Sequence, residues 1–189
     1  MKRLSLLFAA LCMFACPVAA SNHAYMGLYT DSAHSYWCTY GVGFYPVEMW
    51  IWCLPGDPGV ICNEFMISYP VNVIQSTLTQ NWSILSVALG NPATGYATCT
   101  VSCQSEWFWI AHQLLYVTDP TMTSLSIVAH PAIGAYQIAT CEPGYPVGSV
   151  TLLTNLYLNY SGSEPVCQGT ATEEASWGAI KSLMSVGSE

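Results

Sequence analysis

The chain has 189 residues, of which 52% are hydrophobic and 7% are charged, and its formal net charge is -8 at pH 7. A length of this order suits one domain with a core of its own. The scarcity of lysine and arginine argues against a nucleic-acid partner, because phosphate neutralisation requires them. The aromatic and β-branched content argues against disorder.

The chain begins with the pattern of an export signal. Met1-Lys2-Arg3 is basic, residues 4–14 are almost entirely apolar, and Val18-Ala19-Ala20 has the small residues of a cleavage site. We therefore expect residues 1–20 to be a bacterial signal peptide and the protein to be secreted, on the cell surface or periplasmic. A competing interpretation is lipidation at Cys16, although the residues before it fit a lipobox poorly. Later apolar runs are too short for a transmembrane segment.

Residues 21–161 alternate short apolar runs with clusters of Gly, Pro, Asn and Asp, which is typical of β-strands joined by turns. Val, Ile, Tyr, Trp and Thr dominate the runs. No long helical periodicity occurs before residue 170. We predict one all-β domain, a two-sheet antiparallel β-sandwich of Ig-like or jelly-roll-like type. The expected strands are 24–30, 35–44, 46–53, 60–69, 83–89, 95–102, 106–118, 122–130, 135–140 and 149–160.

The chain after residue 161 has a different pattern. Residues 162–172 are small and polar, which predicts a linker, and residues 173–189 have the spacing of a short amphipathic helical tail. Such a short helix needs a surface to pack against. We expect the tail to dock onto a partner protein, a sorting machine or a second copy, and the alternative is that it folds back on its own sandwich. The expected docking residues are Trp177, Ile180 and Met184.

Several short motifs run nearly the whole length of the chain. They are Met26-Gly27-Leu28-Tyr29-Thr30-Asp31 followed by Cys38, Glu64-Phe65-Met66-Ile67, Leu89-Gly90-Asn91-Pro92, and Cys167 followed by Ser-Trp-Gly-x-Ile-Lys-x-Leu at residues 176–183. In these motifs the chain resembles a loose group of uncharacterised secreted bacterial proteins. It departs from them by continuing to residue 189. The resemblance implies a β-sandwich and an extracytoplasmic address, and it implies no activity.

Seven cysteines follow residue 20. An exported chain meets an oxidising compartment, so we expect disulfides. The sequence leaves the pairing open. Local spacing favours Cys53–Cys62 around a Pro- and Gly-rich turn, Cys99–Cys103 as a tight local bridge, and Cys141–Cys167 across the last strand, which leaves Cys38 unpaired.

Tryptophans form two i, i+2 pairs. Alternation along a strand places Trp50 and Trp52 on one face with Glu48, and Trp107 and Trp109 repeat the pattern. Such pairs on an outer sheet face could stack on sugar rings or form a protein-binding patch. The alternative, which the sequence favours, is that this face is covered and the tryptophans are core residues.

Catalytic and metal-binding motifs are weak. No G-x-S-x-G, H-x-x-x-H or H-E-x-x-H motif occurs. Cys99, Cys103 and His112 could bind zinc, but disulfide formation competes and is favoured. We therefore expect no metal and no cofactor. A buried glutamate could serve a hydrolase as an acid, although strand glutamates are more often solvated. The candidates are Glu48, Glu64 and Glu106.

The sequence thus predicts a non-enzymatic secreted or cell-surface protein with a structural or adhesive role, and it gives no specific role. One alternative is a carbohydrate-binding module that uses its tryptophan pairs. A second alternative is a small secreted hydrolase. The expected partners are a protein, bound through the tail, or a glycan, and no nucleic acid.

Overall fold

The computed structural model describes residues 23–40, 45–162 and 167. The predicted signal peptide, most of the predicted linker and the predicted tail lie outside these residues. The described part is all-β and contains no helix. Accordingly, no helix capable of crossing a membrane occurs among the described residues.

Twelve strands make up the described domain. Their bounds are β1 His23–Tyr29, β2 Pro46–Pro55, β3 Val60–Ser68, β4 Val73–Gln75, β5 Thr79–Gln80, β6 Leu85–Asn91, β7 Gly95–Gln104, β8 Phe108–Val117, β9 Thr123–Val128, β10 Gln137–Thr140, β11 Val147–Thr154 and β12 Leu156–Leu158.

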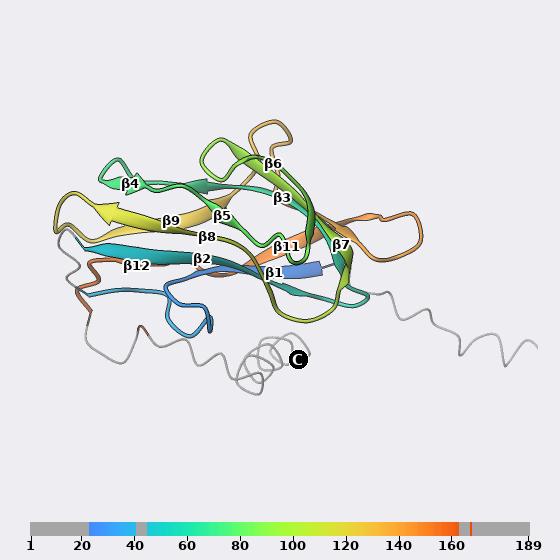
Figure 1. Ribbon diagram of the computed structural model, residues 1–189, viewed down its shortest axis with the longest axis horizontal. Coiled ribbons are helices and arrows are strands. Elements are labelled where there is room, and N and C mark those ends of the chain that lie inside the picture. The colour runs from blue at the N-terminus through green and yellow to red at the C-terminus, as the bar shows by residue number, and fades with distance from the viewer. Residues whose placement is uncertain (1–22, 41–44, 163–166, 168–189) are drawn as a thin grey trace, which may run out of the picture.

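The strands form two layers, with β3 and β6 above β1 and β2 in the view of Figure 1. In one layer β8 pairs with β2, β4 and β5, and β2 pairs with β1. In the other, β3 pairs with β7, β9 and β10, β7 pairs with β6, and β9 pairs with β12. β11 joins the layers, because it pairs with β1 and with β10. The predicted sandwich is confirmed, but β1 and β11 run parallel, so it is not entirely antiparallel.

Alternating side chains build the core between the layers. On β2, Met49 and Ile51 are fully buried, whereas Glu48, which lies between the buried Val47 and Met49, is exposed. On β3, Phe65 and Ile67 are buried in the same alternating way. Burial of each such side chain contributes about 1.5–3 kcal/mol. The period of two in the sequence therefore places one side of each long strand in the core and turns the other side outward.

The predicted strand over residues 35–44 is wrong in its described part. The Asp31 carboxylate accepts hydrogen bonds of 2.9 Å from the backbone N–H groups of Ser35 and Tyr36, which turns the chain after β1. Residues 35–40 then contain only isolated bridge residues, Tyr36 and Cys38, and Cys38 pairs with Tyr157. The short strands β4 and β5 were not predicted, and the predicted strand over 149–160 is divided at residue 155 into β11 and β12.

The three disulfides connect distant segments, so the predicted pairs Cys53–Cys62, Cys99–Cys103 and Cys141–Cys167 are all wrong. Two cysteines on β7, four residues apart, would lie about 13 Å from each other in an extended strand, beyond the reach of a disulfide. Cys53 is unpaired: it lies in the core between the layers, whereas its predicted partner Cys62 is only partly buried and is paired with Cys99. The observed disulfides are Cys38–Cys167, Cys62–Cys99 and Cys103–Cys141, with Cα–Cα distances of 5.2, 4.0 and 5.9 Å.

Candidate functional site

The two predicted tryptophan pairs meet on the outer side of the β1–β2–β8 layer. The β2–β8 register places Trp50 opposite His112 and Trp52 opposite Trp109, with a shift in register between these two positions. Trp107 lies just before β8. We call this side the aromatic face. It consists of Tyr29, His34, Trp50, Trp52, Trp107, Trp109 and His112.

One half of the aromatic face is held together by ring contacts and a charged hydrogen bond. The Trp50 and His112 rings are stacked, with centroids 4.4 Å apart and planes 17° apart. Trp109 meets Trp50 edge to face at 5.2 Å. The Trp50 indole N–H donates to a Glu48 carboxylate oxygen at 2.8 Å. The three rings are only partly exposed, because they cover one another.

The other half of the aromatic face is covered by the turn that follows β1. His34 stacks on Trp107 at 4.5 Å and packs against Trp52 at 4.6 Å. Trp52 retains only 9% of its exposure. Tyr29 packs beneath His34, and its burial raises the pKa of its hydroxyl to about 12 against a smaller opposing effect of the Thr154 hydrogen bond. The expectation of a covered tryptophan layer is therefore right for Trp52.

The geometry of the pairs gives little support to sugar stacking. Trp50 and Trp109 have planes 79° apart, and Trp52 and Trp107 have planes 70° apart. Rings in edge-to-face contact do not form the flat open platform on which a sugar would stack. The aromatic side chains thus pack mainly on one another, on the outer side of the sheet.

The opposite side of the sandwich is apolar and open. Here the Cys62–Cys99 disulfide joins β3 to β7 at directly paired positions. Leu89 and Val101, on β6 and β7, are 64% and 66% exposed. We call this side the disulfide face. It consists of Cys62, Glu64, Val87, Leu89, Cys99, Val101 and Val147.

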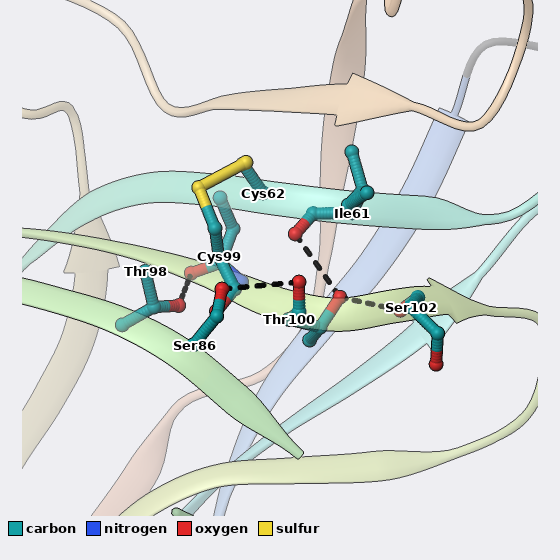
Figure 2. Close-up of a disulfide and its surroundings, with 8 residues drawn as sticks. Ile61, Cys62, Ser86, Thr98, Cys99, Thr100 and Ser102 are labelled. Carbon is teal, nitrogen blue, oxygen red and sulfur yellow. Dashed lines mark hydrogen bonds between the residues drawn. A yellow bond between two sulfur atoms is a disulfide. The ribbon is translucent and has the colours of Figure 1, made fainter.

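Hydrogen bonds behind the disulfide face fasten its three strands together (Figure 2). The Thr98 hydroxyl donates to the Asn63 side-chain oxygen at 2.9 Å, and both residues are almost fully buried. The Thr100 hydroxyl is 3.1 Å from the Ile61 carbonyl oxygen, and that of Ser86 is 3.1 Å from the Cys99 carbonyl oxygen. Because polar groups of neighbouring strands are satisfied by one another, the face is a rigid platform.

The three predicted glutamate candidates are not brought together. Glu48 lies on the aromatic face and Glu64 on the disulfide face, so the sandwich separates them. Glu106 is exposed between β7 and β8. Glu64 is only half-buried and lines a hollow of about 160 Å³ with Gln137 and Val147. None of the three is therefore the fully buried glutamate on which the hydrolase alternative was based.

The predicted zinc ligands are separated as well. Cys99 and Cys103 are in different disulfides, so neither supplies a thiolate. His112 lies in the other layer, against Trp50. No cluster of three His, Cys, Asp or Glu side chains that could hold a metal occurs among residues 23–40, 45–162 and 167.

A third site was missed by the sequence analysis. Segment 37–40 lies beside β12, and side chains from both surround a pocket of about 530 Å³. The Cys38–Cys167 pairing brings the segment there, and the predicted pairing had excluded it. We call it the aromatic pocket. It is lined by Trp37, Leu153, Thr154, Asn155, Tyr157 and Tyr160. The predicted docking residues Trp177, Ile180 and Met184 lie outside the described residues.

No protein-family model and no curated protein matches the chain. Its fold is similar to that of cohesin modules. The non-cellulosomal cohesin of Archaeoglobus fulgidus has a TM-score of 0.51 and 11% identity, over 82% of this chain and 97% of that one. The cohesin of a Clostridium perfringens family 33 glycoside hydrolase has 0.53 and 9%, over 72% and 96%. A type I cohesin in a cohesin–dockerin complex from Clostridium thermocellum has 0.52 and 6%, over 74% and 96%. At these identities the likeness establishes the fold alone.

Proposed function

We propose that this chain is a non-enzymatic, exported protein-binding module that serves adhesion or assembly, and that it binds its partner on the disulfide face. The observation that carries the proposal is the exposure of Leu89 and Val101 on a rigid sheet surface. An apolar patch of this kind is costly to leave in water and commonly marks a protein-binding site.

The fold supports the proposal from a second direction. One of the similar structures is a cohesin bound to a dockerin, and another is a cohesin of Acetivibrio cellulolyticus in complex with the dockerin of Cel5. We infer that this chain, too, uses its sandwich to hold another protein. The partner we expect is a protein with an apolar docking surface, since the most exposed side chains of the face, Leu89 and Val101, are aliphatic.

Three disulfides support export. They join segments 37, 38 and 129 residues apart, and such bonds persist in oxidising compartments. Together with the predicted signal peptide, they make an extracellular, cell-surface or periplasmic address the natural proposal. We also propose that the predicted tail contributes to partner binding.

Site-specific photocrosslinking in the cells that export the protein tests the function. A photoreactive residue at position 89 or 101 should give one discrete protein adduct, whereas the same residue at the exposed positions Val71 and Ile74, before and on β4 of the other layer, should not. The purified adduct partner should then bind Val101→Asp at least tenfold more weakly than it binds Val71→Asp. Equal adducts at all four positions, or equal affinities of the two variants, would refute the disulfide face as the binding site.

A further inference from the structure

The aromatic pocket has walls made by three rings from two segments. Trp37 and Tyr157 have ring centroids 5.6 Å apart with planes at 71°, and Trp37 and Tyr160 are 6.2 Å apart at 70°. Tyr157 and Tyr160 complete the set at 6.1 Å and 67°. Three planes that are each steeply inclined to the other two form the corner of a box instead of a stack.

A backbone frame holds these walls in place. Tyr157 N–H donates to the Trp37 carbonyl oxygen at 3.0 Å, and Thr39 N–H donates to the Tyr157 carbonyl oxygen at 2.9 Å. Tyr160 N–H donates to the Thr39 carbonyl oxygen at 2.8 Å. Cys38 of the same segment is joined by a disulfide to Cys167. The rings are therefore preorganised, and a ligand would not have to order them.

The corner has the dimensions of a site for an organic cation. Where three perpendicular rings with centroids about 6 Å apart turn their faces to one pocket, a point equally distant from them lies about 4 Å from each ring, inside the range of cation–π attraction. Each aromatic ring presents negative charge density on its face, so that three faces together favour a positive group.

The charge of the domain points to the same class of ligand. The described residues include no lysine and no arginine, and the formal charge of the whole chain is -8. The summed field therefore attracts cations and repels anions over the surface. A phosphate or carboxylate ligand would meet both this field and the negative ring faces.

The lining also distinguishes between kinds of cation. None of the six lining residues carries a charge, so that no carboxylate replaces the water lost by a primary ammonium group. A quaternary ammonium group is weakly hydrated and loses much less on entry. Asn155, whose side chain makes no hydrogen bond to the described residues, remains to bind a polar group elsewhere on the ligand.

We propose that the corner formed by Trp37, Tyr157 and Tyr160 binds the trimethylammonium group of a small molecule of the choline type. The site lies away from the disulfide face and does not depend on the proposed function. Failure of either proposal therefore leaves the other standing.

Isothermal titration of the secreted protein with choline chloride tests this proposal. The neutral control is 3,3-dimethylbutan-1-ol, which has the shape of choline without its charge. We expect saturable binding of choline, and binding at least tenfold weaker for the neutral isostere. Equal binding of the two would show an apolar pocket without cation recognition, and no choline binding by folded protein would also overturn the proposal.

Matched variants locate the binding. Tyr160→Leu removes one wall and should weaken choline binding at least tenfold, whereas Tyr160→Phe keeps the ring and should retain most of it. Tyr145→Leu, at an exposed position outside the pocket, should bind like the unaltered protein. Unchanged choline binding by folded Tyr160→Leu would place the cation elsewhere. If that variant does not fold, the comparison of choline with its neutral isostere still tests whether the pocket recognises the positive charge.

Two further titrations test other ligands that the three rings could bind. Phosphatidylcholine vesicles present the same group on a membrane, and cellobiose presents a neutral ligand for aromatic rings. We expect neither to bind more tightly than choline. Binding to vesicles without affinity for free choline would contradict a small-molecule site. Cellobiose binding that Tyr160→Leu abolishes, with no choline binding, would make the pocket a sugar site.

Discussion

The two outer sides of the sandwich differ in a way that composition does not reveal. The aromatic face holds the largest side chains, yet these pack on one another and beneath the turn that carries His34. The disulfide face holds modest aliphatic side chains, yet Leu89 and Val101 remain mostly exposed. Exposure, and not residue size, therefore distinguishes the covered aromatic face from the disulfide face, on which we propose that a partner binds.

Removing a covered ring should have the largest effect on stability. Trp52→Ala leaves a cavity under His34 and Trp107, so we expect it to lower the free energy of unfolding by about 3–5 kcal/mol. Chemical denaturation without reductant measures this. Val101→Ala on the disulfide face should stay within about 0.5 kcal/mol. Equal losses for the two variants would contradict the assignment of one covered and one open face.

The disulfide of the open face should contribute nearly as much. Cys62 and Cys99 close a loop with a sequence separation of 37, and replacing both by serine should cost about 2–4 kcal/mol. The same denaturation measurement applies, and Cys53→Ala with the disulfides intact is a control for the loss of sulfur alone. A loss below 1 kcal/mol would mean that the hydrogen bonds of Figure 2 hold the strands without it.

Alkali should weaken the folded protein, and Tyr29 of the aromatic face should contribute to this effect. Burial raises the pKa of Tyr29 from 10.0 to about 12, so the folded protein keeps a proton that the unfolded chain loses. Its contribution is complete below pH 10 and is lost as pH rises toward 12, at about 1.4 kcal/mol per pH unit. Denaturation midpoints between pH 9 and pH 12 measure this slope. Tyr29→Phe should reduce this slope without abolishing it, because burial also raises the pKa of Tyr69 and Tyr96. Tyr145→Phe at an exposed site should leave the slope unchanged.

The smallest effect on stability is expected from a change on the open face that should be decisive for binding. Val101→Asp places a charge on an exposed side chain and should alter the unfolding free energy by no more than about 0.5 kcal/mol. Thermal unfolding checks this. If Val101→Asp unfolded the protein, the residue would belong to the packing and its role in binding would lose support.

The sequence predicted most long strands because alternation requires only local information. β2 and β3 are close to their predicted bounds, and their buried residues follow from the period of two. The disulfides could not be predicted in this way, since the partner of Cys62 depends on the register of β3 with β7. The aromatic pocket was missed for the same reason, because Trp37 and Tyr157 are 120 residues apart in the chain and meet only through backbone pairing of their segments.

Alternation correctly placed the tryptophan pairs on one face of the sheet, but it did not predict which of their side chains are exposed. Trp52 is covered by His34, a residue eighteen positions earlier in the chain, and nothing in the local pattern indicates this contact. Leu89 and Val101 gave no signal at all, because an exposed aliphatic residue on a strand looks like a core residue until the layers are placed.

Carbene footprinting of the protein on the exporting cells, compared with the purified protein alone, tests the central claim most directly. The account predicts that Val87, Leu89 and Val101 react in the purified protein and are protected on the cells, while Trp52 is unreactive in both. Protection of Trp50 and Trp109 on the cells, with Leu89 and Val101 still reactive, would contradict it and would make the aromatic face the binding surface.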